Sequence, residues 1–150
     1  MNAVDQAIGF DRVSKIAAVT NLFCLHFPET SVDFSPWLDT AETRKFDDLN
    51  SIDIAFNFTN QRYCRSQSVL LQIQLPRNGS SSNGSSSNDR PLNIEIAGYG
   101  NSGVQWQFST TGGSEFWGSG LPSLDDEIKL REIFHWIIDI FKVDVSQTIN

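Results

Sequence analysis

Apolar residues occupy every second position in four segments of the middle of the chain, which is typical of strands that bury one face of a sheet. Between Gln67 and Leu75 this alternation is interrupted only by Leu70. The other three segments run from Ile52 to Phe58, from Leu92 to Tyr99 and from Val104 to Ser109. Turn-forming residues separate the last two of these, at Gly100 to Gly103. The pattern predicts an antiparallel meander with one face toward the core, to which Ser114 to Trp117 can add a short further strand.

Apolar residues at three- and four-residue steps flank this region and predict a helix on each side of it. The first helix is expected from about Val4 to Leu25 and ends before Pro28. The last helix begins after Ser123, which can cap it, and runs to about Lys142. Its apolar residues cover too wide an arc for contact with one sheet alone. We therefore expect it to pack on both the sheet and the first helix, or to offer part of its surface to another chain.

Shorter elements are expected between the first helix and the first of these strands. Thr30 to Phe34 reads as a short strand or an extended link, and a short helix is plausible from Thr40 to Phe46. The fold class predicted for residues 1–150 is a single two-layer α+β domain. It has an antiparallel meander of four to five strands, with the N- and C-terminal helices packed on one face. The Ser, Gly and Asn tract at 78–89 is expected to be a flexible loop, because none of its residues can pack.

Charge and cysteine usage narrow the class of protein. The chain has 150 residues and a formal net charge of −7, which argues against a nucleic-acid or anionic-membrane partner because both require a basic surface. No apolar run of about 20 residues occurs, and the start lacks the basic head and apolar run of a signal peptide. Cys24 and Cys64 are too far apart to suggest a disulfide framework. These features favour a cytoplasmic protein with free thiols.

The sequence contains few residues in arrangements typical of catalytic sites. Its two histidines, His26 and His135, lie in the predicted helices outside any catalytic motif. A metal site would need Cys24 and His26 to meet Cys64 and His135, and their spacing does not demand this. We therefore predict no catalytic residue, metal or cofactor, and lean against an enzyme.

Polar side chains on the outward sheet face are a further candidate site. Asp53 and Glu95 are expected there, among a row of amides: Asn57, Gln72, Gln74, Asn93, Gln105 and Gln107. Such a row can bind a polar ligand. It is also what an ordinary solvated sheet face carries, and this second interpretation is the stronger one.

Exposed aromatic and apolar residues give the main functional hypothesis, which is a non-catalytic protein-interaction module such as an assembly factor, adaptor or chaperone-like protein. Its partner is another protein or a second copy of the chain. The candidate binding residues are Trp117, Tyr99, Tyr63, Trp136, Ile140 and His135. The alternative is a small-ligand carrier or weak enzyme with a cavity between sheet and helices. Its expected lining is Trp106, Phe108, Phe56 and Trp136, with His135 as the polar group.

Overall fold

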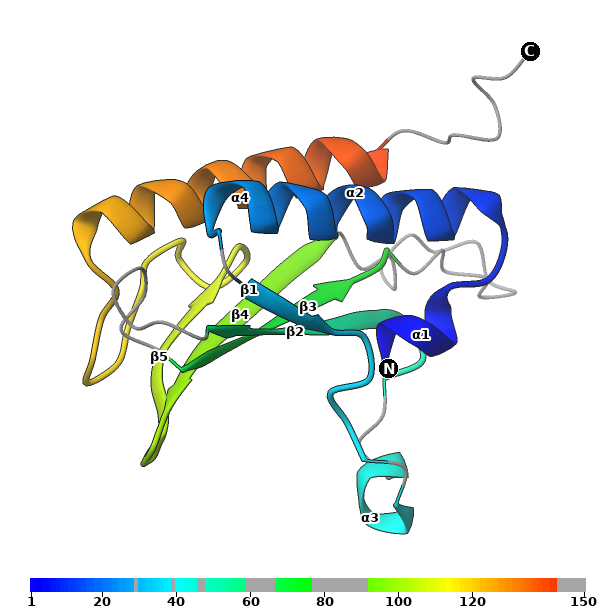
Figure 1. Cartoon of the computed structure of the whole chain (residues 1–150), viewed down its shortest axis with the longest axis horizontal. Helices are drawn as coiled ribbons and strands as arrows, with labels where there is room; N and C mark the ends of the chain where they lie inside the picture. Colours follow the sequence, from blue (N-terminus) through cyan, green and yellow to red (C-terminus); the bar gives the residue numbers. More distant parts are fainter. Residues whose placement is uncertain (29, 39, 46–47, 59–66, 77–91, 143–150) are drawn as a thin grey trace, which may run out of the picture.

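A five-stranded antiparallel sheet with two long helices on one face forms the body of the protein (Figure 1). The computed structural model describes residues 1–28, 30–38, 40–45, 48–58, 67–76 and 92–142. The elements in chain order are α1 (Ala3–Gln6), α2 (Phe10–His26), β1 (Thr30–Asp33), α3 (Ala41–Arg44), β2 (Ser51–Phe58), β3 (Ser68–Gln74), β4 (Asn93–Gly100), β5 (Gly103–Ser109) and α4 (Leu124–Lys142). The predicted α+β fold class, with its meander and its terminal helices, is confirmed.

The strands follow one another across the sheet in the order β1-β2-β3-β4-β5. Their register aligns the apolar rows, so that Ile54 pairs with Leu71, and Leu71 pairs with Ile96. These inward side chains are 2% exposed or less. The tight turn expected at Gly100 to Gly103 joins β4 to β5, and Gly103 there has a φ of 109°. The period-two alternation therefore placed the core face correctly.

The two long helices lie side by side on this inner face, as Figure 1 shows. Phe23 of α2 stacks on Phe56 of β2 with ring centroids 3.8 Å apart, and Phe134 of α4 stacks on Phe108 of β5 at 4.7 Å. The helices also contact each other, since His26 lies 3.2 Å from Glu132. The wide apolar arc of α4 is thus used largely within the chain, against both the sheet and α2.

Two elements differ from the prediction. The first helix is split into α1 and α2, because Gly9 adopts a φ of 84° that residues with a side chain rarely tolerate. The fifth strand is β1, which lies within the segment expected as a short strand or link and pairs with β2; the segment ending at Trp117 does not supply it. Trp117 makes only an isolated bridge with Gln107 beside β5. The expected loop at 78–89 lies outside the described residues.

The outer face of the sheet is partly covered, which the alternation alone does not predict. Beyond the end of β1, the N-terminal residues lie alongside β2. The Asp53 backbone N–H donates to the Met1 carbonyl at 2.9 Å. The segment with α3 lies on this same outer side (Figure 1). As a result Asp53 is only 2% exposed, although its side chain points away from the helices. The expectation of a uniformly wet outer face is wrong at this end of β2.

Loss of the stacked ring at Phe23 is expected to destabilise the protein strongly. Phe23→Ala should lower the free energy of unfolding by about 3–5 kcal/mol, because a fully buried aromatic ring is replaced by a cavity. Urea denaturation followed by circular dichroism measures this. Leu25→Ala, on the same helix at 77% exposure, is the control and should change stability by less than about 0.5 kcal/mol. Equal effects of the two substitutions would contradict the inner-face packing described above.

Candidate functional site

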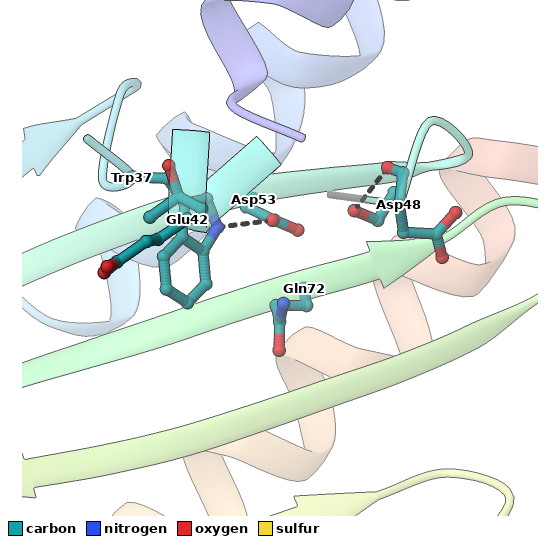
Figure 2. Close-up of a pocket in the computed structure, with 7 residues that line it drawn as sticks. Trp37, Glu42, Asp48, Asp53 and Gln72 are labelled. Carbon is teal, nitrogen blue, oxygen red and sulfur yellow. Dashed lines mark hydrogen bonds between the residues drawn. The ribbon is translucent and has the colours of Figure 1, made fainter. Parts of the chain in front are cut away.

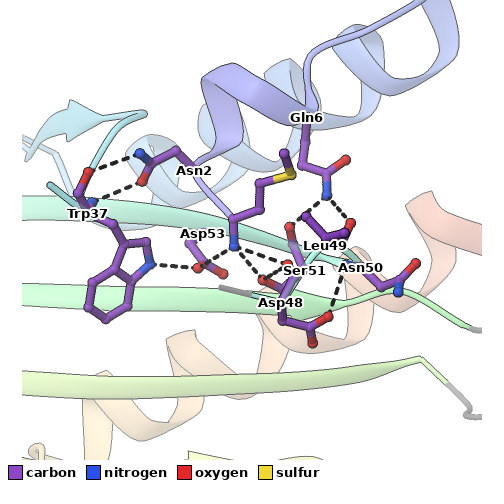
Figure 3. Close-up of polar contacts among 9 residues, drawn as sticks. Asn2, Gln6, Trp37, Asp48, Leu49, Asn50, Ser51 and Asp53 are labelled. Carbon is purple, nitrogen blue, oxygen red and sulfur yellow. Dashed lines mark hydrogen bonds and ion pairs between the residues drawn. The ribbon is translucent and has the colours of Figure 1, made fainter. Parts of the chain in front are cut away.

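The candidate site lies on the outer face of the sheet around Trp37, whose position is set by the start of the chain. The Trp37 backbone N–H donates to the Asn2 Oδ1 atom at 2.9 Å, and the Asn2 Nδ2 group donates to the Trp37 carbonyl at 3.0 Å (Figure 3). This pair of hydrogen bonds holds the backbone of Trp37 over β2. Its indole ring lies across the outer face with 41% of the residue still exposed.

The carboxylate of Asp53 is the polar centre of this region. Its Oδ2 atom accepts hydrogen bonds from the Trp37 indole N–H at 2.6 Å and from the Met1 amino group at 2.9 Å (Figure 3). Its Oδ1 atom is buried and has no hydrogen-bond partner among the described residues. Buried polar atoms without a partner are uncommon in folded proteins, because burial removes their bonds to water. Within the described part of the chain, only one of the two Asp53 carboxylate oxygens therefore has a hydrogen-bond partner.

Further hydrogen bonds fix the backbone and side chains next to Asp53. The Met1 amino group also donates to the Ser51 Oγ atom at 2.7 Å. The Gln6 side-chain amide donates to the carbonyls of Leu49 at 2.7 Å and Ser51 at 3.0 Å (Figure 3). Arg12 donates in turn to the Gln6 Oε1 atom at 2.7 Å. These bonds join α1 and α2 to the first residues of β2. The arrangement fixes the Asp53 backbone and its carboxylate in place.

A pocket of about 310 Å³ opens beside this carboxylate. We call it the acidic pocket; the described residues that line it are Trp37, Glu42, Thr43, Asp48, Ser51, Asp53 and Gln72. Figure 2 shows the Asp53 carboxylate between the Trp37 ring and Asp48, with Gln72 on the neighbouring strand. A reciprocal pair of hydrogen bonds between Thr40 and Thr43 caps α3 and so positions Glu42 at the pocket.

A second pocket, of about 240 Å³, lies on the other side of Trp37. We call it the apolar pocket; its described lining is Pro36, Trp37, Ala55, Ser68, Val69, Leu70 and Tyr99. Leu70, the one residue that broke the alternation of its strand, points into this space on the outer face. Trp37 is the wall that the two pockets share. The outer face thus carries a bipartite surface divided by one exposed tryptophan.

The binding residues expected from the sequence are not brought together. Tyr99 lines the apolar pocket, whereas Trp117 is 47% exposed beside β5 and Trp136 is 53% exposed on α4. The His135 side chain is 76% exposed and lies 3.7 Å from Asp139 on the same helix. Ile140 is half-buried against the core. Tyr63 lies outside the described residues.

The cavity expected between the sheet and the helices is not formed by the residues assigned to it. Trp106, Phe56 and Phe108 are at most 4% exposed and belong to the filled core. His135 and Trp136 are on the exposed side of α4, where they cannot share a lining with those three residues. Both pockets described above lie on the opposite face of the sheet. The residues assigned to that cavity therefore do not line one space together.

Among the described residues, the cysteine and histidine side chains add no second site. Cys24 is a partly buried free thiol in α2, and burial raises its pKa above the ordinary range, which lowers its thiolate fraction at neutral pH. Cys64 lies outside the described residues. Within the described ranges, no three histidine, cysteine, aspartate or glutamate side chains come close enough to hold a metal ion.

Sequence reasoning identified Asp53 and Gln72 as outward-facing but missed Trp37 and Glu42. Nothing in the pattern around Trp37 shows that its segment crosses to the outer face. The available signal was Asp53 itself. A carboxylate in the middle of an apolar strand requires donors from another part of the chain if that end of the sheet is covered.

The chain belongs to a protein family described as a domain of unknown function, whose model matches residues 4–143. No curated protein and no solved structure matches the chain. Of the helices in the described ranges, none is long and apolar enough to cross a membrane.

Removing the indole N–H of Trp37 is expected to cost stability through Asp53. Trp37→Phe keeps a ring but leaves the Oδ2 atom of a buried carboxylate with one donor fewer, so the free energy of unfolding should fall by about 1–3 kcal/mol. Urea denaturation measures the change. Trp117→Phe is the matched control, since Trp117 is similarly exposed and lies outside this network. An unchanged midpoint in Trp37→Phe would show that the bond to Asp53 contributes nothing.

Proposed function

We propose that this protein is a cytoplasmic, non-catalytic interaction module that binds a short extended segment of a partner protein across the outer face of its sheet. The observation that carries the proposal is the exposed ring of Trp37 standing between two pockets. Tryptophan and tyrosine are the residues most enriched where interfaces gain their affinity. Tyr99 in the apolar pocket adds a second aromatic anchor to the same surface.

The spacing of the pockets supports an extended chain as the occupant. Asp53 lines the acidic pocket and Ala55 lines the apolar pocket, and these residues are two positions apart on the same face of β2. Alternate residues of an extended strand lie about 7 Å apart. A bound segment in extended conformation therefore presents alternate side chains at the separation of the two pockets, which is how peptide-binding domains read sequence.

The size of the surface fits a short segment. From Ser51 to Ala55 the outer face runs for about 13 Å at the rise of a β-strand, which corresponds to about four residues of extended peptide. The acidic pocket is close to the lower end of the volumes that enclose a drug-sized ligand, and the apolar pocket is below it. Two small pockets that share one tryptophan suit two side chains better than one buried small molecule.

A randomised peptide library displayed on phage tests this proposal with a defined probe. Selection on the wild-type protein, tagged at its C-terminus, should enrich sequences that share a motif. Trp37→Ala should weaken their binding by about tenfold or more, as expected for the loss of a central aromatic anchor. Ser68→Arg should also weaken it by filling the apolar pocket without touching the core.

Trp117→Ala is the matched control for peptide binding, and it should leave the affinity unchanged because Trp117 lies outside both pockets. Circular dichroism and the unfolding midpoint establish that each variant is folded. Enriched peptides that bind wild type, Trp37→Ala and Ser68→Arg equally well would overturn the proposed surface. A library that yields no sequence dependent on Trp37 would overturn it as well.

Helix α4 supports a second candidate function, which is self-association. Trp136, Leu124 and Ile128 are 51–72% exposed on this helix, so it retains apolar surface that the chain does not cover. Acidic residues gather in its first turn and Lys142 lies in its last turn. Two copies of α4 in antiparallel orientation therefore bring opposite charges together, as a two-fold symmetric interface requires.

Sedimentation velocity over a range of concentrations tests this second candidate. Wild type should show a concentration-dependent dimer, and Trp136→Ala should shift it toward monomer by about tenfold or more in dissociation constant. Trp117→Ala should sediment like wild type. A wild-type protein that stays monomeric at the highest concentrations overturns the dimer through α4 and leaves the outer-face proposal untouched.

A further inference from the structure

We propose that the acidic pocket is a specificity site for a positively charged side chain, lysine or arginine, of the bound segment. This inference rests on the proposed function for its setting, since it assigns the chemistry of one of the two pockets. The argument begins at the Asp53 Oδ1 atom, which is buried and has no partner among the described residues. Asp53 lines the pocket and is 2% exposed, so its carboxylate has lost most of its contact with water beside a space that a ligand can enter.

A charged donor gains most from such an acceptor. Hydrogen bonds between an ammonium or guanidinium group and a carboxylate are shorter and stronger than bonds between neutral groups. The same carboxylate already binds one primary ammonium group, that of Met1, at 2.9 Å through its Oδ2 atom. The Oδ1 atom is an acceptor of the same kind and has no such donor among the described residues.

The rest of the lining supports a cation. Glu42 lies at the pocket on the exposed side of α3 and adds a second carboxylate at its rim. Trp37 forms the shared wall, and the faces of tryptophan rings attract cations. The Gln72 side chain adds an amide oxygen that can accept a further bond. No lysine or arginine side chain is among the described lining, whereas Glu42, Asp48 and Asp53 all are, and their negative charge disfavours an anionic side chain.

The geometry favours an organic cation over a metal ion. Glu42, Asp48 and Asp53 all line the pocket, but in the described part of the chain no three such groups approach closely enough to ligate one ion. An ammonium or guanidinium group needs no such convergence, because its several donors can reach acceptors spread over a pocket. Its methylene stem can meanwhile lie along the Trp37 ring.

Nuclear magnetic resonance with capped amino acids tests the site directly. The probes are N-acetyl-lysine methylamide and N-acetyl-arginine methylamide, added to uniformly ¹⁵N-labelled protein with a C-terminal tag. They should shift the Trp37 indole N–H and the Gln72 side-chain amide signals. N-acetyl-norleucine methylamide, which keeps the stem and lacks the charge, should bind about tenfold or more weakly. The glutamate derivative should leave both signals in place.

Two substitutions in the acidic pocket separate charge from shape. Asp53→Asn retains the size of the side chain and should abolish the preference for the charged probes over norleucine. Glu42→Gln changes an exposed residue of α3, so the fold is not at risk, and it should weaken lysine binding about two- to fivefold. Glu115→Gln, an exposed glutamate near β5, is the matched control and should have no effect. Equal binding of lysine and norleucine, or of lysine by wild type and Glu42→Gln, overturns the inference.

The peptide selection distinguishes failure of this inference from failure of the proposed function. Enriched peptides that carry lysine or arginine at one fixed position, and lose that preference on Asp53→Asn protein, support both. Enriched peptides that depend on Trp37 but carry no fixed basic residue overturn the cation site and leave the interaction module standing. In a third outcome, the lysine probe shifts the Trp37 and Gln72 signals but the library yields no peptide that depends on Trp37. This result overturns the interaction module and assigns the cation site to a free amine.

Discussion

Burial of the Asp53 carboxylate is the constraint on which the outer side of the molecule depends. A buried carboxylate is tolerated only where donors surround it. Here the donors come from two distant segments, the Met1 amino group and the Trp37 indole, and both must reach the same end of β2. Meeting this requirement draws the start of the chain and the segment before α3 onto a face that the two long helices do not cover. The walls of both pockets follow from that arrangement.

The fold was predictable because its determinants are local and periodic. The alternation in β2, β3, β4 and β5 assigns most inward side chains to the core, with Val104 at 45% exposure as an exception, and the three- and four-residue steps assign α2 and α4 to one covering layer. Glycine residues limited how accurately the sequence predicts where helices begin and end. Gly9 could be tolerated in a continuous helix or could break it, and only its φ of 84° shows that α1 and α2 are separate elements.

The candidate site was not predictable in the same way, because it depends on contacts between residues far apart in sequence. Asn2 and Trp37 are 35 positions apart, and Met1 and Asp53 are 52 positions apart. Periodicity carries no information on such contacts. It placed Asp53 and Gln72 on the outer face, but it could not show that Trp37 crosses them or that Asp53 is buried. It also favoured the aromatic residues of α4, which the structure places on the opposite side of the sheet from the pockets.

The two faces of the sheet therefore differ in how their side chains are packed. The inner face is filled by stacked aromatic rings such as Phe23 on Phe56, and this packing leaves those residues no freedom to bind a ligand. The outer face gains little stability from close packing, since Trp37 and Tyr99 keep part of their surface exposed. Its half-satisfied carboxylate costs the folded protein free energy that a bound donor can return. A buried acceptor with no partner among the described residues is what distinguishes this end of the outer face from an ordinary solvated sheet face.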